Sequence, residues 1–85
     1  MVRIEWAVRA VKQLRKLPQG DQVKVHAAVG GLAQWPDVRN VKALVNRIDY
    51  RLRVGRYRVL FHVMPDGSVT VINIDEVRKR DEHTY

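Results

Sequence analysis

The stretch that decides the fold of this chain is residues 49–61, which read DYRLRVGRYRVLF. Apolar and cationic residues alternate on both sides of Gly55. A strand places successive side chains on opposite faces, and glycine accepts the positive φ that a tight turn needs. The stretch therefore predicts a β-hairpin in which Arg51 and Arg53 share one face of the first strand and Arg58 lies near the start of the second.

These three arginines are expected to converge on one side of a sheet. Arginine keeps its charge at any working pH, and its planar fork of donors matches the oxygens of a phosphate. The composition also allows a solvated face with scattered acidic partners. Of these two interpretations, the convergent cluster points to a function, and that function is the binding of a phosphate.

Charge and length narrow the class of partner. The 85 residues carry 16 Lys and Arg against 9 Asp and Glu, a net charge of +7, which favours a polyanion: nucleic acid, an acidic protein segment or a membrane surface. The basic amphipathic stretch near residues 5–17 has only a modest apolar stripe, so nucleic acid is favoured over a membrane. One domain spanning residues 1–85 is expected.

The residue types also limit cofactors and compartment. The chain contains 0 cysteines, so disulfides and thiolate metal sites are excluded, and we expect no metal or cofactor. No window approaches the ~18 apolar residues that span a bilayer, and the N-terminus lacks the apolar run of a signal peptide. A cytoplasmic location is the resulting prediction.

Periodicity divides the rest of the chain. Residues 2–6 alternate like a strand, whereas residues 7–17 place apolar side chains on one helical face. A second helix is expected from an Asp21 cap to Pro36, although Gly30 and Gly31 weaken its interior. Residues 36–45 are expected to form a loop, and residues 46–64 the hairpin.

The C-terminal part has a turn, a strand and a tail. Residues 64–68 read MPDGS, a strong turn signal, and residues 69–77 are rich in β-branched side chains. The tail, residues 78–85, is too polar for the core. The predicted fold is α+β: two N-terminal helices packed on one face of a small, largely antiparallel four-stranded sheet in the order β-α-α-β-β-β. The uncovered face would receive the hairpin arginines and the tail.

In the hairpin YRLRVGRYRV, residues 50–59, and in the tail VRKR, residues 77–80, followed by Tyr85, the sequence resembles the RelE/ParE superfamily of small bacterial toxins. Within it, the tail is similar to the RelE-like mRNA interferases. The resemblance covers nearly the whole chain and implies a ribosome-dependent endoribonuclease that cleaves mRNA in the decoding site. Its implied partners are mRNA with the small ribosomal subunit and a cognate acidic antitoxin, whose complex would set the oligomeric state.

The resemblance also implies roles for individual residues. Attack of the 2′-hydroxyl on the adjacent phosphate leaves a 2′,3′-cyclic phosphate and needs no metal. Charge stabilisation falls to Arg58 and Arg80. The residues implied in substrate binding are Arg51, Arg53, Arg56 and Lys79.

Two residues of the tail compete for the role of general base. Tyr85 matches a tyrosine of the RelE pattern, but a phenol with a pKa of ~10 is ionised to only about one part in a thousand at pH 7. Nearby cations would have to lower that pKa, and the α-carboxylate of Tyr85 would oppose them. His83 has an ordinary pKa of ~6.5, which already suits acid or base work. Stacking on a base is another role open to Tyr85.

Two other functions remain open at this level. A ParE-like inhibitor of a DNA topoisomerase would use the same scaffold without chemistry of its own. A plain RNA-binding module is the third reading, because an α-β-β-β order echoes double-stranded-RNA-binding domains. Trp6 and Trp35, at the ends of apolar stripes, are expected in the core, and His26 is expected in solvent.

Overall fold

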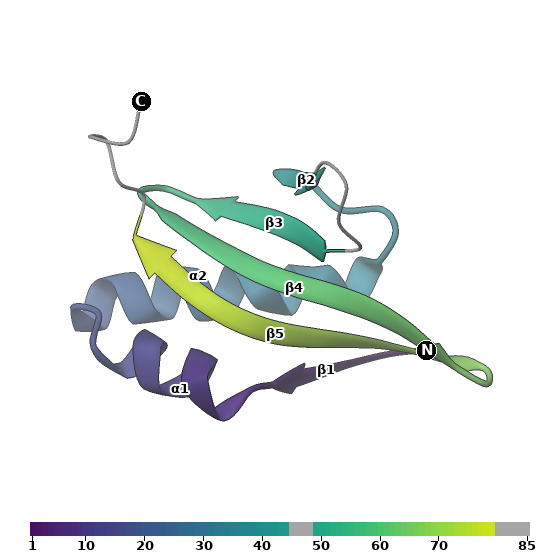
Figure 1. The fold of residues 1–85 in the computed structure, drawn as a ribbon. Coiled ribbons are helices and arrows are strands. Elements are labelled where there is room, and N and C mark those ends of the chain that lie inside the picture. Colours follow the sequence, from purple (N-terminus) through teal and green to yellow (C-terminus); the bar gives the residue numbers. More distant parts are fainter. Residues whose placement is uncertain (45–48, 80–85) are drawn as a thin grey trace.

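The computed structural model describes residues 1–44 and 49–79, which form two α-helices against a five-stranded mixed sheet (Figure 1). The elements are β1 (Val2–Trp6), α1 (Val8–Arg15), α2 (Gln19–Gly30), the 3-10 turn η1 (Gly31–Gln34), β2 (Val41–Ala43), β3 (Asp49–Val54), β4 (Tyr57–Asp66) and β5 (Val69–Lys79). The strand order is β1-β5-β4-β3-β2. The predicted class, with two N-terminal helices on one face of a small sheet, is confirmed.

The sheet has one strand more than the four expected. Residues 41–43 pair with β3 as the short strand β2, within a segment predicted as loop. Three residues are too few for alternation to be visible in a sequence, so the pairing comes from tertiary contact. β1 runs parallel to β5, while β2, β3, β4 and β5 pair antiparallel in turn. The expectation of a largely antiparallel sheet therefore holds for three of its four strand pairs.

The second helix differs from its prediction at both ends. It begins at Gln19 after Pro18, and Asp21 lies in its first turn rather than at the cap. The α-helix ends at Gly30, and η1 continues the chain for one tighter turn to Gln34, so the helix stops short of Pro36. Paired glycines weaken a helix interior, which explains the change of helix type at this point.

The turns that join β3 to β4 and β4 to β5 are each two residues long. Val54 pairs with Tyr57 across Gly55, which has φ +56°, and Asp66 pairs with Val69 across Gly67, which has φ +63°. Such turns require a positive φ that glycine adopts without strain. The second turn is shorter than expected, because Pro65 and Asp66 belong to β4. The last strand is longer than expected, since β5 extends two residues past Val77.

The core lies between the helices and one face of the sheet. Its fully buried side chains include Val25 and Val29 of α2, Leu32 of η1, and Val59, Phe61, Ile72 and Ile74 of the two long strands. Trp35 packs edge-on against Tyr50 and Phe61 with ring centroids 4.9 and 5.7 Å apart, which agrees with its expected core position. Trp6 packs against this core, and the exposed His26 stacks on its ring. Among the residues described, no helix is long and apolar enough to cross a membrane.

One polar contact ties α2 to the sheet. The Tyr57 hydroxyl donates a hydrogen bond to Asp21 Oδ2 over 2.7 Å, and Tyr57 is only 6% exposed. That bond, burial and the Asp21 charge raise the pKa of Tyr57 above its ordinary value near 10, and the Arg56 charge opposes them in part. Asp21 therefore acts through this long-range contact, not as the cap that the sequence predicted.

This contact predicts a stability that declines in alkali. Above pH ~10 the unfolded chain loses the tyrosine proton first, while the native state retains it, so stability falls as pH rises. Tyr57→Phe removes both the bond and its titration. We expect the melting-temperature gap between the wild type and Tyr57→Phe to be largest near pH 8 and to shrink towards pH 11. Tyr50→Phe controls for loss of a tyrosine hydroxyl, and a gap that stays constant with pH would contradict the prediction.

Candidate nucleic-acid interface

The sheet face opposite the helices carries the three hairpin arginines of the predicted site. Along β3 the core side chain Leu52 alternates with Arg51 and Arg53, and along β4 Val59 alternates with Arg58. Since Leu52 and Val59 pack in the core, the arginines project from the other side of the sheet. In the parts of the chain that the structure describes, no helix covers this open face.

The strand register lines up three arginines across the open face. Arg53 pairs with Arg58, and Arg58 pairs with Arg78 of β5. Directly opposed residues on neighbouring strands have Cβ atoms ~5 Å apart, so Arg53, Arg58 and Arg78 form a continuous cationic row, called the arginine row below. Arg51 adds a fourth cation one cross-strand position away, opposite Leu60. Like charges in direct opposition repel one another, and an anion bound across the arginine row would reduce that repulsion.

The other predicted site residues fall into two groups. Arg56 is exposed in the turn beside the arginine row. Lys79 pairs with Tyr57, whose side chain is in the core, so the strand alternation assigns Lys79 to the helix side of the sheet. Arg80, His83 and Tyr85 lie outside the described residues. The structure thus brings Arg51, Arg53 and Arg58 together on one face and does not place Lys79 with them.

Arg78 is the site residue that sequence reasoning missed. The sequence predicts that the last strand ends at residue 77, which leaves Arg78 in the polar tail, yet β5 continues to Lys79. The Arg78 guanidinium contacts both carboxylate oxygens of Glu76, with 3.0 Å from Nη2 to Oε2 and a hydrogen bond of 3.2 Å from Nη2 to Oε1. This ion pair orients Arg78 over the sheet. The detectable signal was the alternation itself, since Arg78 follows the buried Val77.

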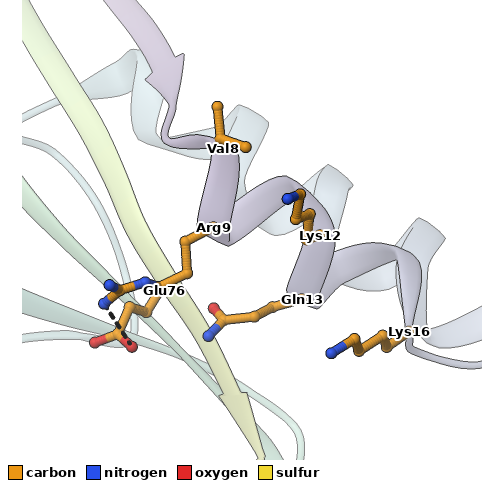
Figure 2. Close-up of a pocket in the computed structure, with 6 residues that line it drawn as sticks. All are labelled: Val8, Arg9, Lys12, Gln13, Lys16 and Glu76. Atoms are coloured by element: carbon orange, nitrogen blue, oxygen red, sulfur yellow. Dashed lines mark ion pairs between the residues drawn. The ribbon is translucent and has the colours of Figure 1, made fainter.

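A second basic surface lies beside the first, on α1. Figure 2 shows the hollow between α1 and β5, which is lined by Val8, Arg9, Lys12, Gln13, Lys16 and Glu76. Arg9 reaches across it to Glu76, with 3.8 Å between Nη1 and Oε1, and Gln13 Oε1 accepts the Val77 N–H over 2.7 Å. Because Glu76 contacts both Arg9 and Arg78, the cations of α1 continue the charged surface of the arginine row around the edge of β5.

The arginine row can bind a phosphodiester and stabilise additional negative charge on it. Guanidinium groups donate two parallel hydrogen bonds to phosphate oxygens, and such charge-assisted bonds are about twice as strong as neutral ones. A row of several guanidiniums along one face also matches successive phosphates of a single strand, because a basic groove tracks the backbone. This geometry favours nucleic acid over a compact anion.

No protein-family model matches the chain, and no curated protein matches its sequence. Solved structures, in contrast, match the fold of the chain. A chain of the RelBE2 toxin–antitoxin complex from Mycobacterium tuberculosis is 27% identical with a TM-score of 0.76, and the alignment covers 92% of this chain and 96% of that chain.

Two further structures are similar. A chain of the archaeal RelE–RelB complex from Pyrococcus horikoshii is 26% identical with a TM-score of 0.78, covering 95% of this chain and 97% of that one. A YoeB/ParE toxin from Agrobacterium tumefaciens has a TM-score of 0.75 over 93% of this chain and 99% of its own at 11% identity, which shows a shared fold alone.

The arginine row predicts a gain in stability when one charge is removed. Arg53→Gln should raise the free energy of unfolding by ~0.2 to 1 kcal/mol at low salt, because it relieves repulsion from the opposed Arg58. The gain should vanish near 1 M salt, where the screening length is ~3 Å. Urea unfolding at both salt concentrations measures this, with the exposed Arg39→Gln as control. A loss of stability at low salt would argue against repulsion in the row.

Proposed function

Because its structure makes the chain a member of the RelE-like toxin superfamily, we propose that it is the toxin of a type II toxin–antitoxin system and a ribosome-dependent endoribonuclease. The observation that supports this most directly is the arginine row on the uncovered face of that fold. It is a surface suited to a single-stranded phosphodiester, and mRNA in the decoding site is such a strand.

The proposed reaction is an internal transphosphorylation. The 2′-oxygen attacks the adjacent phosphorus, the bond from phosphorus to the 5′-oxygen breaks, and the products are a 2′,3′-cyclic phosphate and a free 5′-hydroxyl. A base removes the 2′-hydroxyl proton, and an acid protonates the leaving oxygen. The phosphorane between these steps carries extra negative charge, which preorganised guanidiniums stabilise. Each of these tasks can be met by protein side chains.

The residues divide these tasks among themselves. Arg58, at the centre of the arginine row, faces the phosphorane together with Arg80 of the tail. Arg51 and Arg53 bind the flanking phosphates, and Arg78 extends that contact across β5. Arg56, in the turn beside the arginine row, adds a further cation to this surface, whereas Lys79 lies on the helix side of the sheet and has no part in it. Either Tyr85 or His83 serves as the general base.

The proposed second partner is an acidic antitoxin. Two solved structures similar to this chain are toxin–antitoxin complexes, RelBE2 and RelE–RelB, and the open face offers a polypeptide the same positive charge that it offers RNA. An acidic segment that folds on binding can cover such a surface and exclude mRNA from it. The proposed location is the cytoplasm, where both partners would be found.

The central role of Arg58 predicts a loss of cleavage. Arg58→Ala should reduce cleavage of ribosome-bound mRNA by ~100- to 1,000-fold, because a preorganised charge contact to the transition state is removed. Mapping 5′ ends of message in a purified translation system measures it. Lys24→Ala, an exposed cation of α2, is the control and should cleave like the wild type. Full activity of Arg58→Ala would refute the assignment, and inhibition of topoisomerase supercoiling without cleavage would support the ParE-like function instead.

The two candidate bases of the tail predict that substituting one of them reduces the cleavage rate much more than substituting the other. A general base contributes ~10²- to 10⁴-fold, so one of Tyr85→Phe and His83→Gln should lose at least ~100-fold in single-turnover cleavage and the other less than ~10-fold. The pH–rate profile then identifies the base, since imidazole titrates near 6.5 and phenol near 10 unless cations lower it. Two variants with wild-type rates would exclude both residues.

A further inference from the structure

Three side chains that can bind a metal ion meet on the open face, away from the arginine row. They are Asp49 of β3, His62 of β4 and Asp75 of β5, one from each of three adjacent strands. Asp49 and His62 are register partners. A β-bulge shifts the β4–β5 register between Leu60 and Phe61, so that β5 has an extra residue at this point, and Asp75 thereby reaches His62.

The distances suit a small divalent ion. One potential ligand atom from each residue lies within 4.8 Å of the other two, and His62 Nδ1 is 2.7 Å from Asp75 Oδ2. A tetrahedral zinc ion with bonds of ~2.0 to 2.1 Å separates its ligand atoms by about 3.3 Å. Separations of no more than 4.8 Å leave only short side-chain movements between the observed arrangement and ligation of one ion.

The cluster has the supporting contact that metal sites use. Asn73 Nδ2 donates to Asp75 Oδ1 over 2.7 Å, which fixes the orientation of this carboxylate and directs Oδ2 at His62. The side chains of His62 and Asp75 are only 25% and 32% exposed. Outer contacts of this kind hold metal ligands in place. The ligands are therefore partly preorganised and are not freely solvated carboxylates.

The chemical types of the three ligands indicate which ion suits this position. Imidazole with carboxylate suits zinc and its transition-metal neighbours, whereas magnesium and calcium prefer oxygen alone. We propose that Asp49, His62 and Asp75 form a zinc-class divalent metal site, with a fourth position open to water.

This site is separate from the proposed cleavage chemistry. His62 follows Arg58 by four residues on β4, a separation of ~13 Å at 3.3 Å per residue. The cluster therefore lies two cross-strand positions along the open face from the arginine row. Its occupancy is independent of the metal-free reaction, and failure of one proposal leaves the other standing.

Calorimetric titration of the untagged full chain with ZnCl₂ tests the site. We expect one zinc ion per chain, and Co²⁺ should give visible absorption bands of low-symmetry coordination while Mg²⁺ gives no heat. Asn73→Ala should weaken zinc binding ~10- to 100-fold through the lost contact to Asp75, and His62→Gln should weaken it further. His26→Gln, at an exposed histidine of α2, is the matched control and should bind like the wild type.

Two outcomes would overturn the site. They are the absence of saturable zinc binding by the wild type, and undiminished binding by folded His62→Gln. Circular dichroism establishes whether each variant is folded. If His62→Gln does not fold, Asp75→Asn replaces it as the test variant, because asparagine keeps the shape of the aspartate side chain. Cleavage of ribosome-bound mRNA in EDTA is the separate readout for the proposed function and should equal cleavage with zinc.

Discussion

The register between β3 and β4 is the constraint on which the rest of the molecule depends. Gly55 closes the hairpin in two residues, and this length fixes Leu52 opposite Val59 and Arg53 opposite Arg58. A slip of one residue would turn every side chain of a strand to the other face. It would bury arginines beneath α2 and expose the apolar residues of the core, so the hydrophobic effect enforces the alignment of the cations.

The open face is therefore divided along its length. Near the Gly55 turn, the arginine row concentrates positive charge across three strands, and farther along the same strands Asp49, His62 and Asp75 concentrate oxygen and imidazole ligands. The two ends of the open face are therefore suited to ligands of opposite sign, an anion at the arginine row and a cation at the other cluster.

Much of this fold could be predicted from local pattern, because the hairpin and the first strand alternate clearly. The predicted sharing of one face by Arg51 and Arg53 follows from the same period. β2 and the parallel pairing of β1 with β5 could not be predicted, since they depend on tertiary contacts and not on local preference.

The candidate site shows the same limit. Arg78 belongs to the arginine row only because β5 continues past Val77. Asp75 contacts His62 only because of a β-bulge, whose position the sequence does not reveal. Long-range register decides both. The predictions for Arg80, His83 and Tyr85 lie outside the described residues and remain predictions.

The hydrogen bond between Gln13 and β5 affects whether a strand from another copy of the protein can pair with the edge of the sheet. β1 pairs with β5 only as far as Ile74, so the next stretch of β5 would offer bare backbone donors to any passing strand. Gln13 occupies the Val77 N–H, and α1 lies alongside. Sheets with unguarded borders recruit further chains into aggregates. The Gln13 amide thus removes one of the donors through which a strand of another copy would pair with this edge of β5.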